Sequence, residues 1–173
     1  MLLYVNLMCM EHQKHITAKD MTCAFYQQLS SKFQTLLPNV YLKPAPAFEL
    51  DICAVKKSRL LLEIEIKVSR ENFKQDLRKA DIQHGNKHRA LREGRLPPNY
   101  FSFLLPDYLL QECSIPPYCG LYIAHWNKAG DKLLVSERRL PKLLHKQTLT
   151  PNQINDIRSK SYDRMWNLYQ EQS

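Results

Sequence analysis

The stretch "LLLEIEIKV", residues 60–68, alternates aliphatic and charged side chains. Successive side chains of a β-strand point to opposite faces of the sheet, so the alternation predicts a strand with one apolar face and one charged face. The charged face carries Glu63, Glu65 and Lys67. An ordinary edge strand exposes such charges to water, but two carboxylates and an ammonium group in one row can also serve chemistry.

A second strand is predicted at residues 49–55, "ELDICAV", and the polar residues 56–59, "KKSR", suit a hairpin turn between the two strands. Glu49 and Asp51 share one face of this strand, opposite its aliphatic residues. If the aliphatic faces of both strands lie on one side of the sheet, all of these charges share the other side. A slip of one residue would break this agreement, so the pattern limits the register.

Helices are predicted on both sides of the hairpin. Residues 17–39 form the first, with Thr17 and Asp20 in a capping box and a proline near the end. Ser69 is the predicted N-cap of a second helix over residues 70–84. The elements predicted further along the chain are a helix at residues 87–94, strands at 99–106, 119–126 and 132–137, and a last helix beginning at Pro151. This order predicts one α/β domain with a mixed sheet flanked by helices.

The composition points to an anionic partner and a reducing compartment. The 173 residues carry a formal net charge of +8, which favours nucleic acid first and an acidic membrane surface second. The five cysteines are odd in number and scattered, unlike a disulfide framework, and Cys113, Cys119 and His125 match no standard zinc spacing. No stretch approaches the ~20 apolar residues of a membrane span. Residues 1–16 are predicted as a first strand or an extension, not as a signal peptide.

The charged face suits a divalent metal ion. Asp51 and Glu65 are candidate ligands for Mg²⁺ or Mn²⁺, which bind carboxylate oxygens, backbone carbonyls and water. The backbone carbonyl of Ile66 is a natural further ligand. Two more carboxylates either assist the metal or face solvent, namely Glu49 and Glu63.

Lys67 completes this set. It lies two residues beyond Glu65 on the same strand face, ~7 Å further along the strand. From there its ammonium group can hold an attacking water or the charge that develops on phosphorus. Together with a bound metal ion, these residue types are what phosphodiester hydrolysis requires.

These residues resemble the D…ExK signature of the PD-(D/E)XK nuclease superfamily, which has the restriction-endonuclease-like fold. Residues 65–79, "EIKVSRENFKQDLRK", also resemble the core "E-x-K-x-S…DF…D…K" of phage and bacterial MmcB-like proteins assigned to DNA repair. Residues 115–123 and 139–146 resemble downstream segments of that group, so the likeness covers roughly residues 17–150. The chain departs from the group at Asn72, where aspartate is frequent, and in an apparent insertion at residues 80–86.

The resemblance implies a Mg²⁺-dependent deoxyribonuclease in the cytoplasm of a bacterial or phage-infected cell. Asp51 and Glu65 would be its metal ligands and Lys67 its catalytic lysine. It also implies three parts of the chain, namely an N-terminal strand or extension at 1–16, a nuclease-like core at 17–150 and a C-terminal helix at 151–173 packed on the core.

A basic run follows the hairpin, and we predict that it contacts nucleic-acid phosphates. Its candidate residues are Lys74, Arg78, Lys79, Lys87, His88, Arg89 and Arg92. A solvated helix face has the same pattern, and for His88 a partly buried, hydrogen-bonded side chain fits the helical stripe better. DNA is the favoured partner, no membrane partner is expected, and a homodimer or a protein partner stays open.

Two alternative functions remain at this point. The same fold without turnover would be a module that binds DNA or a partner protein, and the same chemistry could act on RNA. A complete D…ExK set favours hydrolysis over the silent module. Nothing in the sequence separates DNA from RNA, since no RNA-stacking motif is visible.

Overall fold

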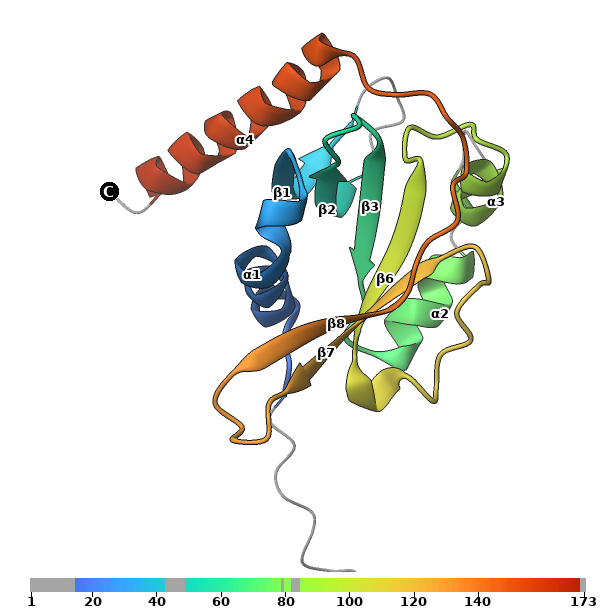
Figure 1. Ribbon diagram of the computed structural model, residues 1–173, viewed down its shortest axis with the longest axis vertical. Helices are drawn as coiled ribbons and strands as arrows, with labels where there is room; N and C mark the ends of the chain where they lie inside the picture. The colour runs from blue at the N-terminus through green and yellow to red at the C-terminus, as the bar shows by residue number, and fades with distance from the viewer. Residues whose placement is uncertain (1–14, 43–48, 79, 82–84, 172–173) are drawn as a thin grey trace, which may run out of the picture.

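The computed structural model describes residues 15–42, 49–78, 80–81 and 85–171. Within them, six strands form one mixed sheet in the order β1-β2-β3-β6-β7-β8 (Figure 1). These strands are β1 (Thr35–Tyr41), β2 (Glu49–Val55), β3 (Leu61–Ile66), β6 (Tyr100–Pro106), β7 (Gly120–Trp126) and β8 (Leu133–Arg139). The α-helices are α1 (Ala18–Leu29), α2 (Arg70–Arg78), α3 (Lys87–Arg92) and α4 (Pro151–Glu171). A short antiparallel pair, β4 (Ala80–Asp81) and β5 (Gly85–Asn86), lies between α2 and α3. The predicted single mixed α/β domain is confirmed.

The hairpin of β2 and β3 has the predicted register. Ile52 pairs with Ile64, and Cys53 pairs with Glu63. The aliphatic side chains of both strands therefore share one face, and the charged side chains share the other. β3 also pairs in parallel with β6, so the charged row lies inside the sheet and not at its edge.

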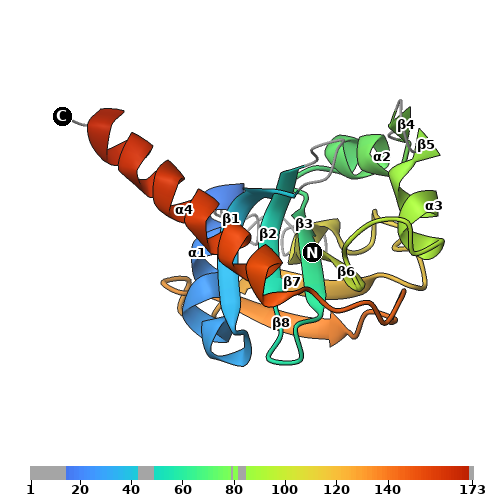
Figure 2. The same ribbon diagram turned by 90° about the horizontal axis from the view of Figure 1, so that it is seen from above.

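Helices cover the two faces of the sheet from opposite sides (Figure 2). α1 packs on the aliphatic face of the hairpin, where Phe25 and Ile64 are fully buried. α2 and α3 pack on the other face against Phe101 and Phe103, whereas Leu104 of the same strand faces the α1 side. Coverage on both faces explains the continuous apolar run of β6. It also means that α2 and α3 lie over the charged face of β3.

The first predicted helix is too long. Its capping box is confirmed, because Thr17 Oγ1 accepts the N–H of Asp20 at 3.1 Å and Asp20 Oδ2 accepts the N–H of Thr17 at 3.0 Å. However, α1 ends at Leu29, a 3-10 turn spans Ser30–Lys32, and the residues after it form β1. Pairing with β2 outweighs the helical spacing of their apolar side chains. Pro38 fits because β1 is an edge strand.

α2 is also shorter than predicted. Its N-cap is confirmed, since Ser69 Oγ accepts the N–H of Asn72 at 3.2 Å. The continuation to residue 84 is wrong, because the chain leaves the helix to form the pair of β4 and β5. Asn86 then caps α3, its Oδ1 accepting the N–H of Arg89 at 3.2 Å.

Residues 140–150, here called the strap, connect β8 to α4 and pass the starts of β3 and β6. The fully buried Asn99 holds the strap in place. Its Nδ2 donates to the carbonyls of His145 at 2.9 Å and Gln147 at 2.8 Å, and its Oδ1 accepts the N–H of Leu61 at 2.7 Å. One amide side chain thus fixes where the strap leads into the last helix.

α4 packs on the sheet through its first turns only. Ile154 and Ile157 are buried against the β1 side of the sheet, and the rest of the helix extends away from the domain (Figures 1 and 2). The predicted apolar positions Met165 and Leu168 lie outside the residues whose side chains are described. In the described part of the chain, no helix has the length and apolar character needed to cross a membrane.

Candidate active site

The charged side chains of β3 are shielded from water. Glu63, Glu65 and Lys67 expose 0%, 5% and 7% of their surface. An ionised group is costly to bury unless it is paired, so these charges need partners inside the protein. The helices α2 and α3 supply most of them.

Asp51 joins the end of β2 to the end of β3. Its half-buried carboxylate accepts the backbone N–H of Ile66 at 2.8 Å through Oδ2. Burial, and next the negative charge of Glu65, raise the pKa of Asp51 above its ordinary value. The two predicted ligands therefore lie close enough to repel each other. Glu49 is exposed, and its Oε2 accepts the hydroxyl of Tyr41 at 2.9 Å.

Lys67 is held between two carboxylates. Its Nζ lies 2.6 Å from Glu65 Oε1 and 3.3 Å from Asp76 Oδ1. Asp76 comes from α2 and is fully buried. The ammonium group that the sequence predicts as catalytic is thus fixed from both sides, one contact coming from the strand and one from the helix.

A second hydrogen bond holds Asp76 itself. Its Oδ2 lies 3.0 Å from Nε2 of His88, and Nδ1 of the same ring contacts the Tyr118 hydroxyl. A carboxylate only accepts, so Nε2 carries the proton. Burial alone would raise the pKa of Asp76, but the His88 hydrogen bond and the charges of Lys87 and Lys67 hold it well below its usual range. The contact with His88 therefore keeps Asp76 ionised, which stabilises its ion pair with Lys67.

Lys87, the first residue of α3, bridges the two glutamates of β3. Its Nζ lies 2.8 Å from Glu63 Oε1 and 3.0 Å from Glu65 Oε2. Although burial opposes it, the surrounding carboxylates raise the pKa of Lys87, so the group stays charged. Burial raises the pKa of Glu63 to about 7 despite this ion pair. Glu63 is thus an internal group and not a solvent-facing one.

These contacts define a buried charge cluster, consisting of Asp51, Glu63, Glu65, Lys67, Asp76, Lys87 and His88. When the histidine is neutral and all four carboxylates are ionised, they outnumber the two ammonium groups by two. Glu63 Oε2 is buried and accepts no hydrogen bond from the described residues. A divalent cation beside the carboxylates would balance this charge, and oxygen-rich ligands suit Mg²⁺ or Mn²⁺.

The donor set of such an ion is small. Among the described residues, no three His, Cys, Asp or Glu side chains converge as a metal-binding group. A cation held by Asp51 and Glu65 would therefore take its other ligands from backbone carbonyls and water, as Mg²⁺ commonly does. Asp51 and Glu65 offer oxygen donors of the kind that Mg²⁺ takes.

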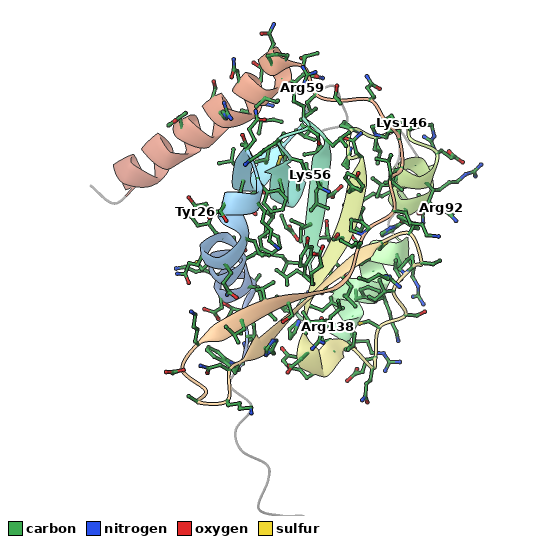
Figure 3. The ribbon with its side chains drawn as sticks, viewed as in Figure 1. Tyr26, Lys56, Arg59, Arg92, Arg138 and Lys146 are labelled. Atoms are coloured by element: carbon green, nitrogen blue, oxygen red, sulfur yellow. The ribbon has the colours of Figure 1, made fainter. Side chains whose placement is uncertain are left out.

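The predicted phosphate contacts divide into two sets. Lys74, Arg78, Arg89 and Arg92 are exposed on α2 and α3, and Figure 3 places Arg92 at the outer side of α3. Arg89 also pairs with Glu93 at 2.8 Å. The other set, Lys87 and His88, is turned inward, because Lys87 neutralises Glu63 and Glu65 while His88 binds Asp76. Lys79 lies outside the described residues.

Two residues of this network were not predicted. Asp76 follows Phe73 at the helical spacing of three, and the burial of Phe73 places that stripe of α2 against the sheet. This spacing is a signal that an acidic residue lies inside. Tyr118 lies in the loop before β7, and no local pattern indicates its contact with His88.

Comparisons with known proteins bear on the fold alone. No protein-family model and no curated protein matches the chain. The structure is similar to a solved structure described as the SPO1766 protein of unknown function from Silicibacter pomeroyi. The two share 17% identity over 88% of each chain, with a TM-score of 0.58. At this identity the likeness concerns the arrangement of helices and strands.

Proposed function

We propose that this protein is a metal-dependent nuclease of restriction-endonuclease-like fold that hydrolyses phosphodiester bonds of DNA. The observation that carries the proposal is the convergence of Asp51, Glu65 and Lys67 on one face of the hairpin. The Asp51 hydrogen bond to Ile66 and the Lys67 ion pair to Glu65 place these groups side by side. The excess of negative charge in the buried charge cluster supports a cation at this place.

Each residue then has a distinct role. Asp51 and Glu65, with the Ile66 carbonyl, would hold Mg²⁺ or Mn²⁺, and such an ion polarises a phosphoryl oxygen and lowers the pKa of a bound water. The Lys67 ammonium orients the attacking water or stabilises negative charge on phosphorus. Asp76 is a positioning residue, since it acts through its contact with Lys67.

The exposed cations of α2 and α3 provide a surface for the substrate. Lys74, Arg78 and Arg92 lie on helices that cover the cluster, and the chain as a whole carries a net charge of +8. Such cations neutralise backbone phosphates without reading base sequence. We infer that they hold the nucleic-acid backbone near the carboxylates.

The first test is cleavage by the full chain of single-stranded DNA, duplex DNA, branched DNA and single-stranded RNA. We expect cleavage of at least one DNA substrate with Mg²⁺ or Mn²⁺ and none with a chelator, because the cation is required for attack. Cleavage of RNA alone would instead identify an RNA-directed enzyme. Binding without cleavage under any divalent cation would contradict the enzyme and favour a binding module.

A second test measures how binding depends on salt without divalent cations. Replacement of Arg78 with alanine should lower the slope of log K against log salt concentration by about one, because one phosphate contact is lost. Lys128→Ala is the matched control, since Lys128 is exposed in the turn between β7 and β8, far along the chain from α2. An equal slope in both variants would remove α2 from the binding surface.

A further inference from the structure

Glu65 has both carboxylate oxygens engaged in the described structure. Lys67 contacts Oε1 at 2.6 Å, and Lys87 contacts Oε2 at 3.0 Å. A carboxylate that binds a cation must turn at least one oxygen toward it. A metal ion on Glu65 would repel both ammonium groups, so we expect one of them to lose its contact when Glu65 becomes a metal ligand.

We propose that Lys87 is this group, namely an internal cation that competes with the metal ion for Glu65 and rests on Glu63 when the metal is bound. The inference rests on the metal-dependent function proposed above. It gives Lys87 a role inside the site, in place of the phosphate contact predicted from the sequence.

The distances from each ammonium nitrogen to its carboxylate partners favour Lys87 over Lys67 as the group that loses its contact with Glu65. Lys67 makes the shorter contact with Glu65, and its second partner Asp76 is the more distant one at 3.3 Å. Lys87 has the opposite preference, because it lies closer to Glu63 at 2.8 Å than to Glu65. Losing Glu65 thus costs Lys87 its weaker contact, whereas it would cost Lys67 its stronger one.

The contact with Glu63 explains why Lys87 stays in the site after it gives up Glu65. Glu63 is fully buried, and Lys87 is the cation that contacts its carboxylate among the described residues. Leaving this charge unpaired would be strongly destabilising. Lys87 therefore neutralises Glu63 both with and without the metal ion. The strength of its contact with Glu63 determines how readily Lys87 leaves Glu65.

The test is calorimetric titration with Ca²⁺, followed by thermal unfolding with and without Ca²⁺ as an independent readout. Lys87→Met should bind Ca²⁺ about tenfold more tightly than the wild type, because its competitor for Glu65 is gone. Its melting temperature without Ca²⁺ should fall, and the rise on adding Ca²⁺ should exceed that of the wild type. Lys128→Met is the matched control, an exposed cation in the turn between β7 and β8, and should change the affinity by less than about twofold. If the methionine variant does not fold, Lys87→Gln replaces it, since its amide still donates to Glu63.

A double-mutant cycle separates competition from a general effect of charge. Glu63→Gln removes the second partner of Lys87 and should weaken Ca²⁺ binding about fivefold or more in the wild type, but less than twofold in the Lys87→Met background. Equal effects in both backgrounds would overturn the proposal, as would a Lys87→Met variant that binds no more tightly than the wild type.

Two further outcomes distinguish a failure of the metal site from a failure of the role proposed for Lys87. If neither the wild type nor Lys87→Met binds Ca²⁺, both the metal site and the role of Lys87 are wrong. If the wild type binds and Asp51→Asn does not, the metal site stands, and the cycle alone decides the role of Lys87.

Discussion

Replacing Asp51 with asparagine is expected to lower metal-dependent cleavage by about a hundredfold or more, without lowering the stability of the metal-free protein. Asparagine keeps an oxygen that can accept the N–H of Ile66, so the link between β2 and β3 survives. It removes the negative charge that would hold the cation. Single-turnover cleavage in Mg²⁺ and denaturant unfolding with a chelator measure the two effects.

The stability part of this expectation follows from the pKa of Asp51. Burial and Glu65 raise that pKa, so ionised Asp51 is less favourable in the folded protein than in the unfolded chain. This cost is absent at low pH and fully present above the raised pKa. Since asparagine never ionises, the variant should be as stable as the wild type at pH 3, below the ordinary pKa of aspartate, and more stable at pH 7.

Glu49→Gln is the matched control for Asp51→Asn. Glu49 lies two residues earlier on β2, is exposed, and accepts the hydroxyl of Tyr41 through Oε2. Its replacement should leave cleavage within about twofold of the wild type. Equal activity of Asp51→Asn and Glu49→Gln would show that Asp51 holds no metal ion.

A substitution of Lys67 would not separate an effect on activity from an effect on stability. Lys67 is buried, and its loss would leave Glu65 and Asp76 without a cation that both of them contact. A Lys67 variant would therefore lose stability as well as activity. Asp51, which is half-buried, allows the two effects to be separated.

The hairpin that carries the site could be predicted because strand periodicity and turn chemistry are local. Alternation along β3 and β2 specifies which side chains share a face, and the turn between them specifies the register. β1 was missed for the opposite reason. Its apolar residues also fit a helical spacing, and only pairing with β2, a partner brought there by the fold, decides for a strand.

The burial of the site could not be predicted from β3 alone. Alternation indicates that Glu63, Glu65 and Lys67 share a face, but not what covers that face. The cover comes from α2 and α3, whose basic residues suggest a fully solvated surface when the sequence is taken alone. Lys87 and His88 belong to this basic run, yet they point inward because the carboxylates beneath them must be neutralised.

The second large effect is expected for Asp76, whose replacement with asparagine should lower the free energy of unfolding by about 3–5 kcal/mol at pH 7. The variant leaves Lys67 with one carboxylate partner and takes the anionic acceptor away from His88 Nε2. Both groups are buried, so water cannot replace the lost contact. Denaturant unfolding of the metal-free protein measures the change, and Glu71→Gln on the exposed side of α2 should stay within about 1 kcal/mol.

The pH dependence of this effect identifies its cause. The pKa of Asp76 is held below its usual range in the folded protein, so its contribution to stability is present above the unfolded value of about 3.9 and is lost as pH falls toward the folded value. Asparagine does not titrate, and the difference between wild type and variant should therefore be largest near pH 7 and shrink below about pH 4. A difference that stays constant down to pH 2.5 would mean that Asp76 stabilises the fold through packing. Its charge would then not be what holds Lys67 in the site.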